Sequence, residues 1–237
     1  MKLRLGVTRT KNQLQSLIEK ATGTGVEVVP LPVIETQPIP FEWPEGLDEA
    51  GVGWLMFTSA NGVHLFFNRM EQIGRSLSGR TRIGTVGRKT AEALNEHGHT
   101  ADFLPSEPYG ETFFTEWADA GTHTGETVMF ARGEKINFDP RDIMTQLKAQ
   151  YFPLVCYQTC PRPVESELIR PFSDNDYILF TAPSCVRSYQ EQFDRPVARP
   201  VAIGRSTAAE MNHLGWNEVI IMEHADVDNI LEYLKWN

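Results

Sequence analysis

The sequence has few cysteines and no long hydrophobic run. Its three cysteines, Cys156, Cys160 and Cys185, are odd in number and have no second cluster nearby, which argues against a disulfide scaffold and against a zinc site. We interpret them as small core residues. No apolar segment approaches the roughly 20 residues of a membrane-spanning helix, and the amino terminus enters a strand pattern without a signal core. The sequence therefore predicts a cytoplasmic protein that makes no membrane contact.

Positive charge is also scarce. The chain holds 22 lysines and arginines against 31 aspartates and glutamates, which gives a net charge of −9. A protein that binds nucleic acid replaces phosphate counterions with a basic stripe. The sequence contains no such stripe, so we expect no nucleic-acid partner.

Common catalytic motifs are missing as well. There is no Gly-x-Gly-x-x-Gly after a strand, no P-loop, no Gly-x-Ser-x-Gly and no His-Glu-x-x-His. His97 and His99 bracket Gly98 in a predicted turn, and we interpret them as a solvated surface pair. His64 and His213 have no evident acidic partner. No nucleophile, metal-ligand set or general base is apparent from these patterns.

What the sequence does contain is a long internal repeat. The segment Phe57-Thr58-Ser59-Ala60 ends an apolar run and is followed by Gly87-Arg88-Lys89-Thr90-Ala91. The same order returns as Phe180-Thr181-Ala182-Pro183 and then Gly204-Arg205-Ser206-Thr207-Ala208. A repeat of this length indicates two units of one architecture. Two such units, joined by short connections, are expected to form a cleft that holds a ligand from both sides.

Strand and helix patterns alternate along the chain. Expected strands lie at 3–7, 26–29, 54–57, 82–86, 100–103, 127–131, 151–157, 177–180, 199–203 and 218–222. Expected helices lie at 11–21, 61–73, 89–97, 111–119, 141–150, 184–192, 207–214 and 226–236. Five prolines between residues 30 and 44 predict an extended crossover, and residues 158–163 predict the return linker.

These patterns predict an α/β protein of two similar domains. Each domain is expected to hold a parallel sheet of about five strands flanked by helices, with a two-stranded linker between the domains. We expect a discontinuous first domain at residues 1–36 and 161–237, and an inserted second domain at residues 37–160.

Basic and hydroxylated residues follow the expected strands. In parallel sheets ligands bind beyond the carboxyl ends of the strands, where helix amino termini expose N–H groups that favour anions. Four arginines, Arg9, Arg88, Arg132 and Arg205, come directly after strand patterns in an otherwise acidic chain. We interpret them as substrate-binding residues for a polyanionic ligand. The alternative for the four arginines is chance placement on the surface. The alternative for each serine or threonine in these turns is a role as a helix N-cap.

Taken together, these motifs resemble the uroporphyrinogen-III synthase family. The resemblance is carried by the two repeat copies, by Ala131-Arg132-Gly133, and by Val155-Cys156-Tyr157-Gln158-Thr159 before a proline-rich linker, and it spans nearly the whole chain. It implies two α/β domains with an active site in the cleft and the activity of a cyclising hydro-lyase in tetrapyrrole (haem) biosynthesis. Enzymes of this family close linear hydroxymethylbilane, an octacarboxylate, with loss of water and inversion of the last pyrrole ring. Uncatalysed closure gives the uninverted isomer.

The resemblance also implies partners and a catalytic residue. It implies no cofactor, no metal, a monomer, a linear tetrapyrrole as the small-molecule partner, and transient contact with the hydroxymethylbilane synthase that supplies it. Tyr157 matches the residue nearest the chemistry, where a phenol with an ordinary pKa of about 10 would protonate the departing hydroxyl. The structural alternative for Tyr157 is a strand-end aromatic residue that fills the interdomain hinge.

The remaining site residues follow by motif. Thr90 and Thr207 match the paired threonines at helix starts, and Ser59 matches a serine at a strand end. The second repeat copy departs from the pattern, because Ala182 stands where Ser59 stands in the first, so Ser184 is the weaker candidate for that hydroxyl. All four are expected to orient substrate carboxylates.

Two other functions fit parts of the pattern. A non-catalytic two-lobed module that clamps a small anion would share the repeat, the linker and the arginines, but would have no use for the Tyr157 phenol. A sugar-nucleotide transferase would need an acidic metal or ribose motif after a strand, and we find none.

Overall fold

The computed structural model describes residues 2–121, 123–222 and 226–235. The chain divides into two compact units. Unit 1 holds Met1–Glu35 and Cys160–Asn237, and unit 2 holds Thr36–Thr159. The assignment of residues 1–36 and 161–237 to one domain and of residues 37–160 to the other stays a prediction.

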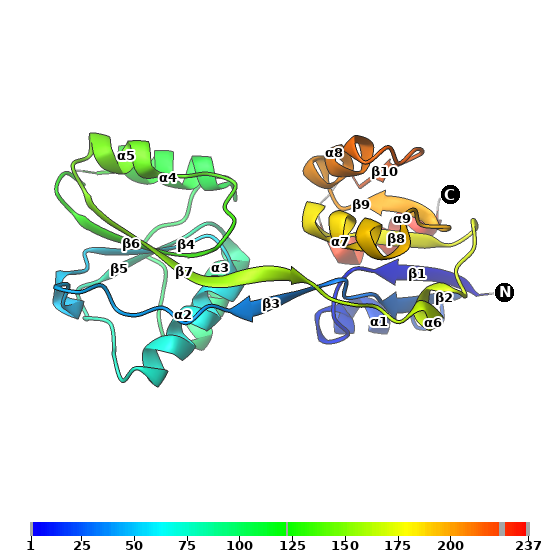
Figure 1. Cartoon of the computed structure of the whole chain (residues 1–237), viewed down its shortest axis with the longest axis horizontal. Helices are drawn as coiled ribbons and strands as arrows, with labels where there is room; N and C mark the ends of the chain where they lie inside the picture. Colours follow the sequence, from blue (N-terminus) through cyan, green and yellow to red (C-terminus); the bar gives the residue numbers. More distant parts are fainter. Residues whose placement is uncertain (1, 122, 223–225, 236–237) are drawn as a thin grey trace. The chain divides into compact units, whose positions relative to one another are not determined.

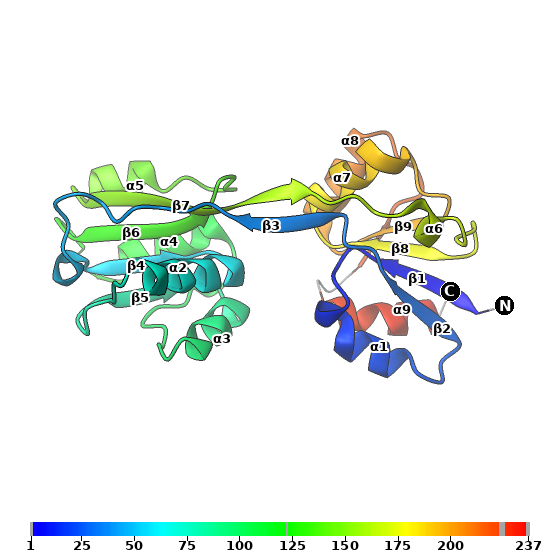
Figure 2. The ribbon, with the colours of Figure 1, turned by 60° about the horizontal axis from the view of Figure 1, so that its bottom comes forward.

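Unit 1 is a five-stranded sheet in the order β10-β9-β8-β1-β2, with parallel pairing at β10–β9, β9–β8, β8–β1 and β1–β2. Its strands are β1 (Leu3–Val7), β2 (Val26–Pro30), β8 (Tyr177–Phe180), β9 (Arg199–Ala202) and β10 (Ile220–Ile221). Its helices are α1 (Gln15–Ala21), α6 (Ser166–Ile169), α7 (Pro183–Phe193), α8 (Arg205–His213) and α9 (Ile230–Lys235), with 3-10 turns at Asn12–Leu14 and Val227–Asn229. Within this unit α7 and α8 lie on one face of the sheet, and α1 and α9 lie on the other (Figure 2).

Unit 2 repeats this plan with the strand order β3-β7-β6-β4-β5. Its strands are β3 (Ile34–Pro38), β4 (Trp54–Phe57), β5 (Arg82–Thr85), β6 (Thr127–Gly133) and β7 (Gln150–Pro161). Its helices are α2 (Ala60–Gln72), α3 (Arg88–Glu96), α4 (Gly110–Asp119) and α5 (Arg141–Gln146), with a 3-10 turn at Glu49–Gly51. Within this unit α4 and α5 cover one face of the sheet, and α2 and α3 cover the other (Figure 1).

The two units are joined by a ribbon of two strands, β3 and β7, which are hydrogen-bonded neighbours. Ile39 N donates to Cys156 O at 2.9 Å, and Arg162 N donates to Val33 O at 2.8 Å. From the first contact to the second, one segment advances six residues while the other goes back six, so the two strands run antiparallel. The expected two-stranded linker is therefore present, and it is built from the proline-rich crossover and the return segment.

The middle strands are buried on both faces because their side chains alternate between two cores. In β4, Leu55 and Phe57 pack with α2 and α3, while Trp54 and Met56 pack with α4. In β8, residues Ile178 and Phe180 belong to the core under α7 and α8. This alternation explains why both strands appear in the sequence as continuous apolar runs, and the predicted α/β fold class is confirmed.

The repeat in the sequence corresponds to a repeat in the sheets. The order β5-β4-β6-β7 of unit 2 matches β9-β8-β1-β2 of unit 1, with Phe57 and Phe180 ending equivalent strands. Gly87 and Gly204 are the N-caps of the equivalent helices α3 and α8. Ser59 caps α2 by accepting from Gly62 N at 3.0 Å, whereas Ala182 at the start of α7 makes no side-chain cap.

Several predicted elements differ from the structure. The expected strand at 100–103 is reduced to one bridge between Gly84 and Phe103, and β3 is the fifth strand of unit 2 in its place. The position equivalent to this bridge in unit 1 holds β10, which has only two residues. Both are edge positions, where each residue has a neighbour on one side only and pairing is weakest.

Helix boundaries also differ. The expected helix at 11–21 begins as a 3-10 turn and becomes α1 only at Gln15, without a cap from Thr8 or Thr10. The helix expected at 141–150 ends at Gln146, because Lys148 takes a left-handed conformation with φ of 53° and Gln150 already begins β7. The last expected helix is a 3-10 turn followed by α9, and its Trp236 lies outside the described residues.

Cys156 and Cys185 are buried in the cores, as predicted, whereas Cys160, which was predicted to be a core residue as well, is only partly buried on β7. In the part of the chain that the structure describes, no helix is long and apolar enough to cross a membrane. Likewise, no group of three or more histidine, cysteine or acidic side chains in those ranges is placed to hold a metal ion.

The histidine pair at 97 and 99 is not a solvated surface pair as predicted. His97 Nε2 lies 3.0 Å from Nδ1 of His64, and the Phe67 ring stacks against both His97 and His99. Helix α2 supplies His64 and Phe67, so the cluster joins α2 to the end of α3. Burial, followed by the charge of His64, lowers the pKa of His97, although Glu96 and Glu71 oppose this effect.

This cluster predicts a pH dependence of stability. Because the folded-state pKa of His97 is lowered, the fold favours the neutral ring, so stability should fall as the pH drops below the ordinary histidine value of about 6.5. We expect a His97→Phe variant to lose less stability than the wild type between pH 7.5 and 5, measured by urea unfolding. A His213→Gln variant, altered at an exposed position, is the control and should keep the wild-type fall. Identical pH profiles for all three proteins would contradict the prediction.

Candidate functional site

The clearest polar pair in unit 2 is Tyr157 with Ser59. The Tyr157 Oη lies 2.8 Å from the Ser59 Oγ, although 98 residues separate them in sequence. Ser59 follows β4 and caps α2, while Tyr157 lies where β7 passes the carboxyl end of β6. The structure therefore brings together the predicted catalytic residue and one of the predicted substrate-binding residues.

A β-bulge sets the direction of the Tyr157 side chain. The register between β6 and β7 shifts at Arg132/Gly133, so that Gly133 pairs with Tyr157 and Cys156 is the extra residue. Strict alternation would place Tyr157 on the face opposite to Cys156, yet both contact the same core under α2. Bulges are known to redirect side chains in this way, and here the bulge aims the phenol at Ser59.

Glycine is required where the Tyr157 ring crosses the sheet. A Cβ added at Gly133 would lie 2.9 Å from two ring carbons of Tyr157 and 3.1 Å from its hydroxyl. Such distances are closer than van der Waals contact allows, so any larger residue at position 133 must displace the ring.

We therefore expect Gly133→Ala to lower kcat of the ring closure that the family resemblance implies by about 10-fold, because the substitution moves the phenol away from Ser59. In a double mutant with Tyr157→Phe, the glycine substitution should add little, because residues in contact are not additive. Gly79→Ala is the control, since nothing lies within 4 Å of a Cβ there. Full additivity of the two substitutions in kcat would show that Gly133 does not act through Tyr157.

Burial keeps the Tyr157 phenol protonated. Desolvation raises its pKa above the ordinary value of 10, and the hydrogen bond with Ser59 offsets only part of that rise. A neutral phenol at neutral pH is able to donate a proton but is a poor base. The site is therefore suited to an acid step at the Tyr157 hydroxyl.

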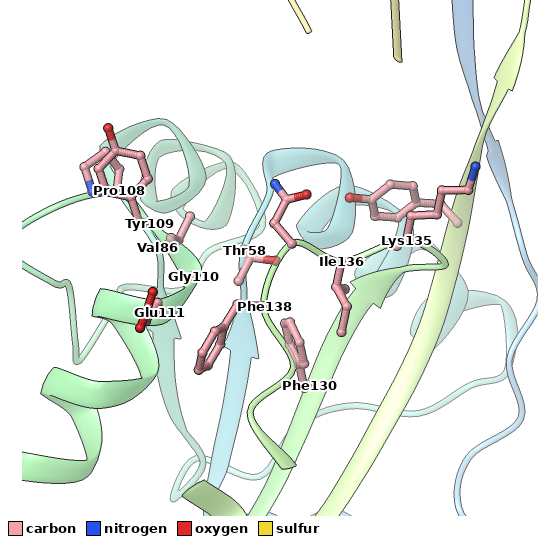
Figure 3. A pocket seen from close by; sticks show the side chains of 13 residues that line it. Thr58, Val86, Pro108, Tyr109, Gly110, Glu111, Phe130, Lys135, Ile136 and Phe138 are labelled. Atoms are coloured by element: carbon pink, nitrogen blue, oxygen red, sulfur yellow. The ribbon is translucent and has the colours of Figure 1, made fainter. Parts of the chain in front are cut away.

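Beside this pair lies a pocket of about 460 Å³ at the carboxyl ends of the strands of unit 2 (Figure 3). Such pockets commonly hold small ligands at about 300–1,000 Å³. Its lining combines apolar, hydroxyl and charged groups, contributed by Thr58, Val86, Pro108, Tyr109, Gly110, Glu111, Phe130, Gly133, Lys135, Ile136, Asn137, Phe138 and Tyr157.

The threonine after the middle strand is used differently in the two units. In unit 1, the Thr181 Oγ1 lies 3.2 Å from the Thr8 Oγ1, so the two hydroxyls bond each other. The equivalent threonine in unit 2 is Thr58, but the residue equivalent to Thr8 is Ala131. Thr58 consequently lacks that partner and lines the pocket.

The four predicted arginines occupy two pairs of equivalent positions. Arg88 and Arg205 are the exposed first residues of α3 and α8. Strand register makes Arg9 and Arg132 equivalent, because Val7 pairs with Leu179 of β8 as Phe130 pairs with Met56 of β4. Each pair therefore places one arginine at the carboxyl edge of each sheet.

Arg9 and Arg132 are held differently. The Arg132 Nη1 donates to the carbonyls of Gly133 and Glu134, both at 3.0 Å, and Arg132 lies within β6 rather than after it as predicted. Burial lowers the pKa of Arg9, although Cys185, Asp226 and Asp228 oppose that shift. Arg9 is thus half-buried just after the end of β1.

The two threonines at helix starts are buried. Thr90 is 5% exposed and Thr207 is 1% exposed, each in the first turn of its helix. Ser184 is the half-buried second residue of α7. That these three bind substrate stays a prediction.

Sequence patterns missed the residues that line the pocket between β6 and α4. Tyr109, Lys135 and Asn137 lie in loops outside the expected strands and helices, and Glu111 is only the first residue of the expected helix at 111–119. One signal was present in the sequence, because Tyr109 is a large aromatic residue between Pro108 and Gly110, just before an expected helix. In the structure Tyr109 is 64% exposed.

The family model for "Uroporphyrinogen-III synthase HemD" matches residues 15–232 of the chain. The chain belongs to the uroporphyrinogen-III synthase family. It is 29% identical over 250 residues to the porphyrin biosynthesis protein HemD of Ruminiclostridium josui, with 96% of the chain and 47% of that protein covered. It thus spans about half the length of that relative. It is 25% identical to the uroporphyrinogen-III synthase of Chlorobaculum parvum, with 93% of each covered.

Solved structures of the family share the fold. The Helicobacter pylori 26695 uroporphyrinogen-III synthetase superposes with a TM-score of 0.67 at 17% identity, over 99% of this chain and 100% of that one. A mutant uroporphyrinogen III synthase from Thermus thermophilus gives a TM-score of 0.61 at 19% identity, over 99% and 98%. At these identities the likeness supports the fold, while family membership follows from the sequence match.

Proposed function

We propose that the chain converts hydroxymethylbilane to uroporphyrinogen III, closing the macrocycle with loss of water and inversion of the last pyrrole ring. The observation that carries this proposal is the hydrogen-bonded pair of Tyr157 and Ser59 beside the pocket in unit 2. The family match and the relatives named as synthases support the same activity.

In the first step the Tyr157 Oη–H donates its proton to the hydroxyl of the bilane. The C–O bond then breaks, water leaves, and a resonance-stabilised azafulvenium cation remains. Burial raises the pKa of Tyr157, so the phenol is fully protonated when the substrate binds. The Ser59 hydroxyl donates to the phenolate oxygen while it carries charge.

In the following steps the cation is attacked by the substituted carbon of the last ring, which forms a spiro intermediate. The bond from the spiro carbon to the methylene of the third ring then breaks, which leaves a second azafulvenium cation. The free α-carbon of the last ring attacks that methylene, which inverts the ring, and loss of the proton from this α-carbon restores the pyrrole. That proton balances the one given by Tyr157, so the net change is closure and release of one water. The cation is reactive by itself, so the contribution of the protein is mainly orientation.

In this proposal the substrate carboxylates are bound by residues at the carboxyl ends of the strands in each sheet. Arg88 and Arg132 serve in unit 2, and Arg9 and Arg205 serve in unit 1, in equivalent pairs. Thr90, Thr207 and Ser184, together with the first N–H groups of their helices, complete the contacts, since helix amino termini favour anions. Salt should weaken these contacts because several of them are exposed.

The proposal includes the setting of the reaction. The chain acts as a cytoplasmic monomer and needs no cofactor, as the family resemblance implies. Hydroxymethylbilane closes spontaneously to the uninverted isomer while it is free in solution. Transient contact with the synthase that supplies it would shorten this time and so reduce the amount of uninverted isomer.

The test is to supply enzymatically generated hydroxymethylbilane and to separate the oxidised porphyrin isomers by chromatography. We expect isomer III well above the uncatalysed background when the chain is present. A passive anion-binding module would bind the bilane and leave only isomer I. The second result would overturn the proposed function.

A further inference from the structure

The pocket in unit 2 has opposite charges on its two sides. Its lining includes one ammonium group, on Lys135, and one carboxylate, on Glu111. Figure 3 shows these side chains on opposite sides of the pocket, with the rings of Phe130 and Phe138 between them. A negatively charged ring in this pocket is therefore attracted by Lys135 at one end and repelled by Glu111 at the other, and the middle of the pocket is apolar.

The two charged residues come from separate elements that fix their positions. Lys135 follows the carboxyl end of β6, two residues after Gly133, which the Tyr157 ring overlies. Glu111 is the second residue of α4, and its carboxylate lies near the amino-terminal end of the helix dipole, where it is favourable. Both side chains belong to exposed residues, so a ligand reaches them without a change of fold.

The shape of the pocket limits what binds. About 460 Å³ lies near the lower end of the range for small-ligand pockets, so it takes one substituted ring rather than a chain of four. Tyr109 is 64% exposed at the rim on the Glu111 side, and offers a flat face to a ring. An aromatic ring that carries carboxylates at one edge therefore fits this lining.

We infer that Lys135 and Glu111 set the orientation of one pyrrole ring of the substrate, with the ring's carboxylates at Lys135 and its other edge at Glu111. The inference rests on the function proposed above and adds two specificity-determining residues to it. Correct orientation of a ring beside Tyr157 decides which ring carbon faces the reactive centre. Lys135 and Glu111 thus influence which isomer forms, and not only how tightly the substrate binds.

Charge reversal tests the attractive end. Lys135→Glu is expected to raise KM for hydroxymethylbilane about 5- to 10-fold with a smaller change in kcat, and added salt should reduce the difference. Lys148→Glu is the matched control, because it makes the same charge change just before the amino end of β7, at the opposite edge of the same sheet. An equal rise in KM for both variants would overturn the inference.

The charge swap Lys135→Glu/Glu111→Lys tests orientation. It keeps the net charge and one cation in the pocket, so ring binding should survive while the ring is turned. We expect the share of isomer III to fall relative to wild type at saturating enzyme. A swapped variant that makes isomer III in the wild-type proportion would show that the positions of the two charges do not matter.

Equilibrium binding separates this inference from the proposed function. The probes are a monopyrrole with acetate and propionate groups and its carboxylate-free analogue, titrated into the full chain and followed by NMR. Lys135→Glu should weaken only the first probe, while Tyr109→Ala should weaken both. If the wild type makes no isomer III but shows this pattern, the proposed function fails and the ring site stands. If Lys135→Glu binds both probes as the wild type does, the ring site fails.

Discussion

Replacement of Tyr157 by phenylalanine is expected to lower kcat for isomer III formation by about 10- to 100-fold, within or just below the usual range for general acid catalysis. The phenyl ring fits the same space against Gly133, so the fold and the pocket remain, but the proton donor 2.8 Å from Ser59 is lost. The measurement is single-turnover formation of the macrocycle with the isomers separated.

The matched control is Tyr151→Phe. Tyr151 lies on the same strand as Tyr157, near the amino end of β7, and burial raises the pKa of its phenol as well. It lies outside the pocket lining, so its loss should leave kcat within about 2-fold of wild type. Unchanged turnover in Tyr157→Phe would remove the phenol from the mechanism.

The largest expected effect on stability comes from Asp176. This carboxylate is 2% exposed and accepts three hydrogen bonds, from Arg4 N at 2.7 Å and from Ser173 N and Oγ at 2.8 Å each. It ties the start of β8 to β1 in unit 1. We expect Asp176→Asn to reduce the free energy of unfolding by about 2–4 kcal/mol, since hydrogen bonds to a charged group are strong and the partly buried donors of Ser173 lose an acceptor.

The stabilisation by the Asp176 carboxylate is expected to be lost in acid. Burial tends to raise the pKa of Asp176, but the hydrogen bonds from Arg4 and Ser173 outweigh it and hold the pKa below the ordinary value. A lowered folded-state pKa means that the stabilisation is complete above the ordinary value of about 4 and is lost as the pH falls through the folded value. The asparagine variant should therefore differ most from the wild type at pH 7 and least at pH 2–3.

The control for Asp176 is Asp174→Asn, two residues away and exposed. It should change the free energy of unfolding by no more than about 0.5 kcal/mol, as exposed substitutions usually do. Urea unfolding of the two variants and the wild type at several pH values measures both effects. A loss in Asp176→Asn that is equally large at low pH would show that the ionised carboxylate is not its source.

Much of the fold is predictable from the sequence because its strongest signals are local. The buried strands at 54–57 and 177–180 were predicted to the residue, since four consecutive apolar residues alternate between two cores. Helix α2 was predicted to within one residue at each end, with Val63, Phe66 and Met70 spaced along its buried face. Edge elements were harder, because pairing on one side alone leaves little trace in the sequence.

The strand β3 shows this limit most clearly. Its residues Ile34–Pro38 are mostly exposed and end in proline, so the sequence indicates an extended crossover without indicating its partner. Pairing with β7 is a contact between segments about 120 residues apart, which no local period reveals. The sequence analysis counted a strand at 100–103 as the fifth strand of this sheet instead of β3, and that prediction was wrong.

The candidate site was predictable where a repeat or a family motif marks it. Ser59 and Tyr157 were identified in this way, and their hydrogen bond agrees with a shared role. Lys135 and Glu111 were not, because their place at one pocket depends on how the loop after β6 and the start of α4 come together in the fold. The bulge that aims Tyr157 also depends on register between strands, and the sequence of β7 alone does not specify it.

In the proposed function this chain directs ring closure toward the inverted isomer. The most direct measurement is a titration in which a fixed amount of freshly generated hydroxymethylbilane partitions between spontaneous closure and the chain at rising protein concentration. We predict that the share of isomer III rises with protein to near completion, and that Tyr157→Phe needs at least about 10-fold more protein for the same share. Isomer I alone at every protein concentration would show that the chain does not catalyse the inverting closure.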